Sequence, residues 1–403
     1  MRWRRDSPPI GVTCVAEIAC ACFLIVAACG STPSLTPPTT HPATSPSPTE
    51  TPGPSTGGPT FQRVEDASGV LPNASGVVPT VVAIPGGGFL LLLRPDSPSG
   101  GRVLRSDDGR TWASVPIENV PPVRRLFAMA ASPKVIVVLC EEGPEDASRV
   151  TAWQAADGRS WARAVDGGAL GRIGAGAIAG SQDGFVVSGF GGIVVAIASP
   201  DATQWNTVSL PIDGSAGSEV SALGSTNDGF AAVGAERRGN GQWPGVAWRA
   251  IDGIWTQALH AGASLNSVSW LHGHGLAVGT TTVPDPSTDD GESTIVVGFE
   301  TLDGGQTWNP PTTPFAAYLR LDTWVIPNGL LVAGAPPGPR QPAALWLSDS
   351  DATWSQLAAD LAVPGDVARL TSVAFDERHI VVVGTTFGTG GGGSEVLAWV
   401  ADR

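Results

Sequence analysis

The stretch SDDGRTW, Ser106 to Trp112, places a hydroxyl, carboxylates, a glycine and a tryptophan close together. These are residue types found in ligand sites, because carboxylates bind cations and aromatic rings stack on flat groups. They also make a tight turn: Ser106 and Asp108 hydrogen-bond to free backbone groups, Gly109 takes a positive φ, and Trp112 packs between sheets. We favour the turn, because it accounts for every residue of the stretch.

Two further stretches carry metal-ligand residue types. HGHG holds His272 and His274 but offers no obvious third ligand, so we expect a turn there. DPSTDDGES, with Asp285 and Asp289, partly resembles a calcium loop, yet the sixth position is Asp290 rather than glycine and the twelfth is Val296 rather than glutamate. We predict no metal and no cofactor, and calcium binding by residues 285–292 stays open.

The candidates for covalent or acid–base chemistry are few. Cys140 ends the apolar run VIVVLC, which indicates a small buried side chain rather than a nucleophile. The acidic residues are numerous, and none stands out as one of a catalytic pair for glycoside hydrolysis. An enzyme of that class is the alternative to a non-catalytic protein.

The composition favours short strands joined by turns. The chain has 403 residues, 42% of them hydrophobic, with 52 glycines, 35 prolines and 14 tryptophans. The formal net charge of −14 argues against nucleic acid as a partner. We therefore expect an all-β protein.

The sequence repeats itself after residue 60. A tryptophan closes a turn-rich motif six times, in SDDGRTW, AADGRSW, SPDATQW, AIDGIW, TLDGGQTW and SDSDATW. The motif residues are Ser106, Asp108, Gly109 and Trp112, then Asp157 and Trp161, Asp201 and Trp205, Asp252 and Trp255, Asp303 and Trp308, and Asp351 and Trp354. A turn followed by an apolar strand recurs between the motifs in seven copies, such as DGFAAVG.

One matching position in each of the seven copies is always large and apolar: Leu104, Trp153, Ile197, Trp248, Phe299, Trp346 and Trp399. Each copy reads as four short strands, and such a sheet must stack on its neighbours. The last copy stops at Arg403 without its fourth strand, whereas Thr60 and Phe61 resemble the end of a motif. We predict a seven-bladed β-propeller in which the N-terminal strand completes the last blade and closes the ring.

The motif resembles the Asp-box, or BNR, repeat, Ser/Thr-x-Asp-x-Gly-x-Thr-Trp. TLDGGQTW, Thr301 to Trp308, fits it best, and four copies are degenerate, with Ala155, Ala250 and Ser350 among the departures. The resemblance implies a propeller of the superfamily that includes sialidases, sortilin-like receptors and photosystem assembly factors. It implies the fold more than an activity.

Sialidases of this superfamily use a tyrosine nucleophile, an arginine triad and an Arg-Ile-Pro motif. The chain has one tyrosine, Tyr318, and its nearest match to that motif is GRIG around Arg172, which lacks the proline. The resemblance therefore does not extend to sialidase activity, and we expect Tyr318 in an inner strand.

The N-terminus indicates export. Arg2, Arg4 and Arg5 precede an apolar run at 18–28, the length of a signal h-region and too short to span a bilayer. VAAC, ending at Cys29, resembles a bacterial lipobox, which implies a lipid on Cys29 and removal of residues 1–28. Residues 29–59 are rich in Ser, Thr and Pro and predict a disordered linker, with the propeller at 60–403.

The loops between second and third strands vary most and lie opposite the motifs. We single out Arg237, Arg238, Trp243 and Arg340 there as candidate partner-binding residues. The sequence thus predicts a monomeric, lipid-anchored propeller on the outer face of the bacterial cytoplasmic membrane, acting without catalysis as a binding or assembly module. Its partner would be an envelope protein or glycan.

Overall fold

The structure is a computed structural model. It describes residues 59–65, 71, 77–95, 101–115, 123–144, 149–164, 168–173, 175–189, 194–211, 218–226, 229–236, 244–285, 291–311, 320–326, 329–335, 343–348, 353–357, 366–388 and 395–403. The chain divides into two compact units, Met1–Glu50 and Thr51–Arg403, and every described residue belongs to the second.

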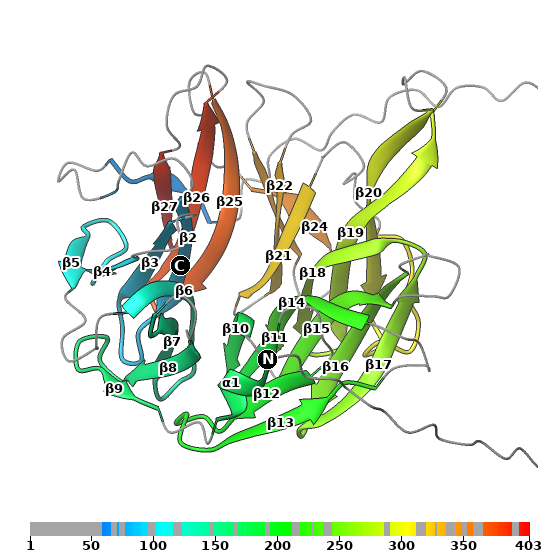
Figure 1. Ribbon diagram of the computed structural model, residues 1–403. Coiled ribbons are helices and arrows are strands. Elements are labelled where there is room, and N and C mark those ends of the chain that lie inside the picture. The colour runs from blue at the N-terminus through cyan, green and yellow to red at the C-terminus, as the bar shows by residue number, and fades with distance from the viewer. Residues whose placement is uncertain are drawn as a thin grey trace, which may run out of the picture. The chain divides into compact units, whose positions relative to one another are not determined.

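Within the described residues, four sheets are antiparallel meanders of four consecutive strands each (Figure 1). The first two contain β2 (Val77–Ala83), β3 (Phe89–Pro95), β4 (Arg102–Ser106) and β5 (Ala113–Val115), then β6 (Val123–Ala131), β7 (Ile136–Glu142), β8 (Arg149–Ala155) and β9 (Ala162–Arg163). The other two contain β10 (Ala175–Ser181), β11 (Gly184–Gly189), β12 (Val194–Ala198) and β13 (Trp205–Ser209), then β21 (Arg320–Ile326), β22 (Gly329–Ala335), β23 (Ala344–Ser348) and β24 (Trp354–Gln356). A short helix, α1 (Ala169–Ile173), lies between β9 and β10 in the chain.

A further four-stranded sheet joins the two ends of this unit. Its order is β1 (Gln62–Arg63), β27 (Val396–Asp402), β26 (His379–Gly388) and β25 (Asp366–Phe375). Gln62 pairs with Val400 and Arg63 with Trp399, as the incomplete last repeat predicts. Phe61 is 1% exposed, so it occupies a buried position just before this strand.

The largest sheet has seven strands and differs from the prediction. It contains β14 (Ser218–Thr226), β15 (Gly229–Glu236), β16 (Gly245–Ile251) and β17 (Ile254–Ala261), followed by β18 (Ser264–Leu271), β19 (His274–Pro284) and β20 (Glu292–Thr301). A single parallel pair, Thr226 with Trp270, joins these two meanders, and the fourth strand of the second is reduced to one bridge between Glu300 and Asn309. By hydrogen bonding, the described strands thus form five separate four-stranded blades and one seven-stranded sheet rather than seven separate blades, because two first strands approach closely enough to pair.

The register confirms the large apolar position of the repeat. Each of its members lies in a third strand opposite a small or aliphatic residue of the second strand: Leu104 with Leu91, Trp153 with Val138, Ile197 with Val186, Trp248 with Ala232, Phe299 with Ala277, Trp346 with Val332 and Trp399 with Val382. Equivalent residues can therefore be compared across all the repeats.

The core consists of apolar clusters between neighbouring groups of strands. In the described residues there are seven, and each one draws on two successive groups. One of them joins β2–β4 to β25–β27, with Phe89, Leu91, Val381 and Val400 all buried. The first strands also contact one another in series, β2 with β6 and so on through β10, β14, β18, β21 and β25, and β25 contacts β2. No helix in the described part of the chain is long and apolar enough to cross a bilayer.

Candidate functional site

The motif around Asp108 is a hydrogen-bonded turn. Asp108 Oδ1 accepts from the backbone N–H groups of Arg110 at 2.8 Å and Thr111 at 2.9 Å, and from Ser106 Oγ at 3.0 Å. Burial alone would raise the pKa of Asp108, but these hydrogen bonds and the Arg110 charge outweigh it and lower the pKa. The Asp108 carboxylate is therefore occupied by its own turn.

Other copies of the motif repeat this geometry. Asp157 accepts from the backbone N–H groups of Arg159 and Ser160, Asp201 from the hydroxyls of Ser199 and Thr203, and Asp303 from those of Thr301 and Thr307. Hydroxyl hydrogen bonds lower the pKa of Asp201 to about 2 and place that of Asp303 well below its usual range. The left-handed turn residue is Gly109, Gly158 and Gly304 in three copies and Ala202 or Asp252 where the glycine is shifted or replaced.

The motif tryptophans attach each turn to the preceding group of strands. Trp112 Nε1 donates to Gly109 O at 3.0 Å, and Trp205 Nε1 donates to Ala202 O at 2.9 Å. Trp112 lies in the cluster with Val381 and Val400, and a Cβ added to Gly109 would meet Val381 Cγ2 at 2.5 Å. These contacts attach the turns to the neighbouring group of strands.

Sequence reasoning missed an arginine that reaches the next turn. Arg105 Nη1 donates to Asp157 O at 2.7 Å, and Arg249 Nη1 donates to Gly304 O at 3.2 Å while its guanidinium lies 4.6 Å from the Trp270 ring. Both arginines follow the large apolar position of their repeats directly. That spacing is the signal by which the sequence could have revealed them.

The two histidines of HGHG have separate surroundings. His274 is buried and its Nε2 lies 2.8 Å from Glu300 Oε1, which also accepts from Trp354 Nε1 at 2.9 Å. His272 takes a left-handed backbone conformation in the turn, with φ of 55°. Among the described residues, no group of three or more His, Cys, Asp or Glu side chains could hold a metal ion. In the proposed calcium loop, the structure describes Asp285 but not 286–290.

Several predicted residues lie outside the described part of the chain. They are Cys29, Arg237, Arg238, Trp243, Tyr318, Arg340 and Asp351. Cys140 is described: it is buried, and burial, with a smaller contribution from Glu142, raises the pKa of its thiol to about 12. That position fits the predicted packing role.

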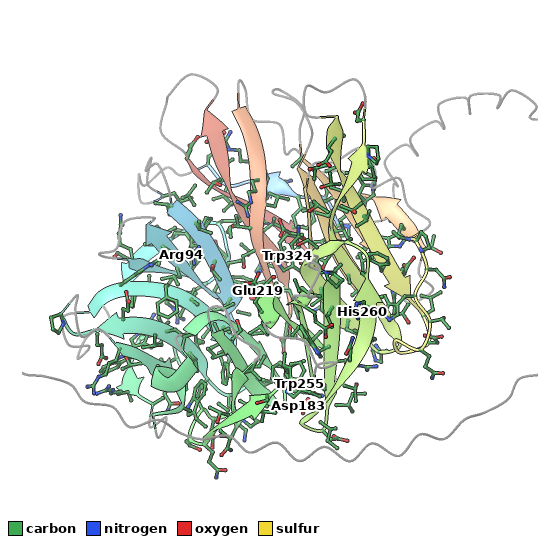
Figure 2. The ribbon with its side chains drawn as sticks, turned by 45° about the vertical axis from the view of Figure 1, so that its right-hand side comes forward. Arg94, Asp183, Glu219, Trp255, His260 and Trp324 are labelled. Carbon is green, nitrogen blue, oxygen red and sulfur yellow. The ribbon has the colours of Figure 1, made fainter. Side chains whose placement is uncertain are left out.

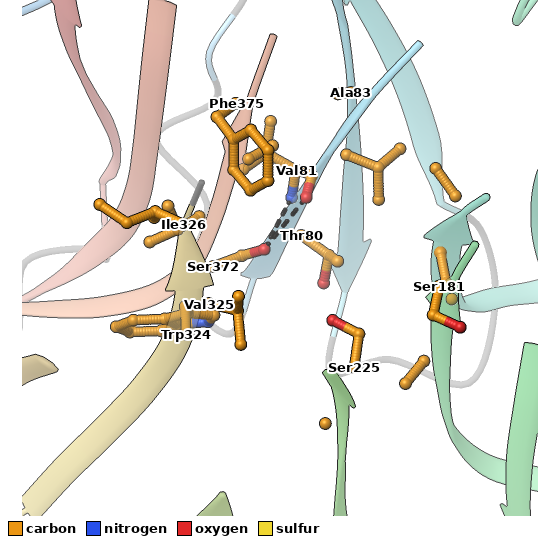
Figure 3. A pocket seen from close by; sticks show the side chains of 18 of the residues that line it. Thr80, Val81, Ala83, Ser181, Ser225, Trp324, Val325, Ile326, Ser372 and Phe375 are labelled. Carbon is orange, nitrogen blue, oxygen red and sulfur yellow. Dashed lines mark hydrogen bonds between the residues drawn. The ribbon is translucent and has the colours of Figure 1, made fainter. Parts of the chain in front are cut away.

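A cavity of about 1620 Å³ is bounded by the first strands of all the groups. Figure 3 shows part of it, with the lining residues Thr80 from β2, Ser181 from β10, Ser225 from β14 and Trp324 from β21. Among the described lining residues that the first strands contribute, Asp322 alone is charged. The cavity wall is thus mainly small, hydroxylated and apolar.

Charged residues lie at the ends of the cavity. Arg105, Asp107, Asp376, Glu377, Arg378 and Arg403 line the end where first strands turn into second strands, and Arg94, near the end of β3, also lines the cavity. Figure 2 shows that Trp255, from a motif turn, and Asp183, from a hairpin turn, lie at the same end of the sheets, whereas His260 lies away from it. One motif turn and one hairpin turn therefore share an end of the sheets, and Asp107 of another motif turn lines the cavity.

Hydroxyls of the first strands also connect neighbouring groups. Ser372 Oγ accepts from Val81 N at 3.1 Å and donates to Val81 O at 3.2 Å, which links β25 to β2. Ser269 Oγ donates to Thr323 Oγ1 at 2.7 Å, which links β18 to β21. These hydroxyls keep the wall in place and are not available to a ligand.

Asp376 is the carboxylate with the most contacts at the cavity end where first strands turn into second strands. It accepts from the backbone N–H groups of Arg378, His379 and Gly88, and His379 Nδ1 lies 3.4 Å from it. Burial would raise the pKa of Asp376, but the backbone hydrogen bonds and the His379 charge lower it. It is therefore ionised at neutral pH, which does not suit the general acid of a glycosidase.

Comparisons with known proteins show the fold. The β-propeller domain of the Trilobed protease from Pyrococcus furiosus is 12% identical, with a TM-score of 0.50 over 81% of this chain and 95% of that one. At this identity the likeness shows a β-propeller and nothing of its activity. Together with the four-stranded sheets described above, it places the chain in the class of all-β propellers.

Two other solved structures are more distant in shape. YCF48 bound to a D1 peptide is 12% identical with a TM-score of 0.47, over 84% of this chain and 96% of that one. The uncomplexed acylaminoacyl peptidase of Pyrococcus horikoshii is 10% identical with a TM-score of 0.48, and the match covers 82% of this chain but only 52% of the peptidase. No protein-family model matches the chain, and no curated protein matches it.

Proposed function

We propose that the protein is a lipid-anchored, extracytoplasmic β-propeller that acts without catalysis as a binding or assembly module of the cell envelope. The observation that carries the binding role is the cavity of about 1620 Å³, which exceeds the roughly 300–1000 Å³ of a small-molecule pocket. Its ligand is then larger than a single metabolite and extends along the cavity.

We infer seven blades arranged in a closed ring. The support is the number of apolar clusters and their membership, since each lies between two successive groups and one joins the last group to the first. The serial contacts of the first strands, returning from β25 to β2, and the pairing of β1 with β27 agree with this arrangement. The seven-stranded sheet then counts as two blades linked by one bridge.

Attachment to the membrane is proposed from Cys29 and the apolar run before it. Cys29→Ala should release the full-length chain from membranes into the soluble exported fraction, measured by fractionation and immunoblotting. Cys140→Ala is the matched control, because it removes the buried thiol only and should leave the membrane fraction unchanged. Equal membrane fractions for Cys29→Ala and wild type would refute the anchor.

The binding role is tested by photo-crosslinking in cells that export the full-length chain. A photoreactive phenylalanine at Ser225 faces the cavity, and one at the exposed Thr256 of β17 faces outward as the control. We expect a discrete adduct, detected by mass spectrometry of the purified chain, from position 225 and not from position 256. Absence of an adduct at 225, or the same adduct at both positions, would contradict a ligand in the cavity.

A further inference from the structure

The third strand of one group has an outer edge that is almost unpaired in the described structure. In the other groups a fourth strand, or β1, pairs with the third strand over two to seven residues. On this side of β20, the described residues form only the bridge between Glu300 and Asn309. Pro310 and Pro311 follow Asn309, and proline has no backbone N–H to donate to a neighbouring strand. The fourth strand is therefore reduced to its first residue there.

The bridge shows which backbone groups of β20 face outward. Glu300 and Asn309 exchange backbone hydrogen bonds at 2.7 Å and 2.9 Å, so the N–H and C=O of Glu300 point away from β19. Backbone groups alternate in direction along a strand, and the register of β20 with β19 has no shift. Val296 and Thr294 therefore direct their N–H and C=O groups to the outer side, where none of the described residues bonds to them.

The hairpin of β19 and β20 also extends past the strand on its other side. β18 pairs with β19 only as far as Thr280, whereas β19 and β20 continue to pair as far as Pro284 and Glu292 (Figure 1). Ile295 lies in this extension, opposite Thr281, and is 40% exposed. A two-stranded ribbon has little stability of its own in water, and a third strand would stabilise it.

β20 lacks the features that keep edge strands apart in other proteins. Such strands are short, are bent by bulges, or carry charges and prolines. Residues 293–299 of β20 read STIVVGF, without a charge or a proline, and they pair with β19 without a bulge. The first strands β14, β18 and β25 each contain a bulge. The outer edge of β20 is therefore a template on which a further strand can pair.

We propose that two copies of the chain pair through β20, antiparallel and centred on Ile295. This register places Thr294 opposite Val296 of the partner subunit, and these two residues exchange backbone hydrogen bonds on each side of the centre. The two exposed Ile295 side chains meet at the centre, where the Cβ atoms of a pair without hydrogen bonds are close together. Glu292 lies opposite Gly298 of the partner subunit, so no like charges face each other.

Self-pairing is favoured over the capture of a strand from another protein. The edge complements itself, and chains that carry the proposed lipid anchor lie in one plane, which raises the local concentration of one edge near another. A pairing this short buries less than the roughly 1,200 Å² of a standard interface, so the dimer should form on membranes and be weak in dilute solution. The dimer goes beyond the proposed binding function and differs from the monomer that the sequence predicts; only its dependence on membranes rests on the proposed anchor.

The test uses the full-length chain in its membranes, with a cysteine introduced at the centre of the proposed pair. Ile295→Cys should form a disulfide-linked dimer on mild oxidation, because the central pair brings the two Cβ atoms within disulfide range. Ile254→Cys is the matched control, since Ile254 is 70% exposed and lies beside the turn that joins β16 to β17. Cys140 is buried in every variant. We expect at least tenfold more linked dimer from Ile295→Cys, measured by non-reducing electrophoresis and mass spectrometry of the linked peptide.

Proline substitutions separate edge pairing from the stability of the hairpin. In the Ile295→Cys background, Thr294→Pro removes an outward N–H from each copy and should lower the yield of linked dimer at least tenfold, because two hydrogen bonds per dimer are lost. Thr282→Pro is the matched control: Thr282 pairs with Thr294 across the hairpin, and its N–H points away from β20. Its yield should stay within about twofold. Equal losses in both variants would overturn pairing through the β20 edge.

Failure of the dimer can be told from failure of the proposed anchor. If Ile295→Cys gives no linked dimer while Cys29→Ala still releases the chain from membranes, the anchor stands and the dimer proposal is wrong. Equal linkage from Ile295→Cys and Ile254→Cys would indicate random collision of crowded chains and would also overturn the dimer. A disulfide from Ile295→Cys to a different protein would show that the edge takes another partner's strand, with the same consequence.

Discussion

Two blades place a glutamate at the same position, and only one of them provides a partner for each carboxylate oxygen. Glu142 lies at the end of β7 and Glu236 at the end of β15. Each comes four residues after the second-strand residue that pairs with the large apolar residue of its own repeat. Both are buried, at 6% and 2% exposure. Their burial is alike, so the difference between the two sites lies in their neighbours.

In the Glu142 site both carboxylate oxygens have partners. Oε1 accepts from Trp153 Nε1 at 2.8 Å, and Oε2 lies 3.3 Å from Arg163 Nη2. A buried carboxylate is tolerated under these conditions because a donor and a cation replace the water it has lost.

In the Glu236 site these partners are replaced. Trp248, the equivalent of Trp153, donates instead to Pro211 O at 2.7 Å, and Gln257 takes the register position of Arg163 opposite that tryptophan. Oε2 lies 3.8 Å from His260 Nδ1, and Oε1 has no hydrogen-bond partner in the described structure. The comparison teaches that two blades can share the backbone position of a buried acid without sharing the groups that neutralise it.

The largest expected effect is at the satisfied site. Glu142→Gln keeps the shape and one acceptor but removes the charge that Arg163 faces, so we expect a loss of about 1.5–2.5 kcal/mol in the free energy of unfolding. Denaturant titration of the full chain, followed by tryptophan fluorescence, measures it. An unchanged midpoint would show that the Arg163 contact adds nothing.

The same substitution should have the opposite sign at the other site. Glu236→Gln replaces a desolvated carboxylate, whose Oε1 is unpaired in the described residues, with an amide that costs less to bury, so we expect a gain of about 0.5–1.5 kcal/mol. The measurement is the same titration, run side by side with Glu142→Gln. Destabilisation of comparable size by both variants would remove the distinction between the sites.

The smallest effect comes from restoring the missing cation. Gln257→Arg places a guanidinium at the register position of Arg163, and we expect a gain of about 0.3–1 kcal/mol, because the new side chain stays partly exposed to solvent. In the Glu236→Gln background the gain should vanish, which a double-mutant cycle reveals. A gain that persists without the Glu236 carboxylate would mean that the arginine acts through packing alone.

Much of the fold was predictable because it repeats. The alternation of turns and apolar strands, the large apolar position and the strand that completes the last group all follow from spacing, and the register bears them out. The pairing of β14 with β18 was not predictable, because it depends on how closely Thr226 and Trp270 approach in space. Asp108, whose residue type also suits a ligand site, accepts hydrogen bonds within its own turn, and such contacts are local in sequence.

The candidate site was predictable only in part. Sequence reasoning placed it on loops around Arg237 and Arg340, which lie outside the described residues, and did not predict the cavity. The cavity is formed by strands distant in sequence, and no local pattern encodes that arrangement.

The sequence by itself determined the strand pattern and the turns that end in motif tryptophans, because these depend on side chains a few residues apart. The tertiary structure alone decided which side chains face the cavity, which arginine reaches the next turn, and why Glu142 is neutralised while Glu236 lacks a partner for one oxygen. The physical reason is that burial and pairing are set by neighbours from other strands, whereas a turn is set by its own residues.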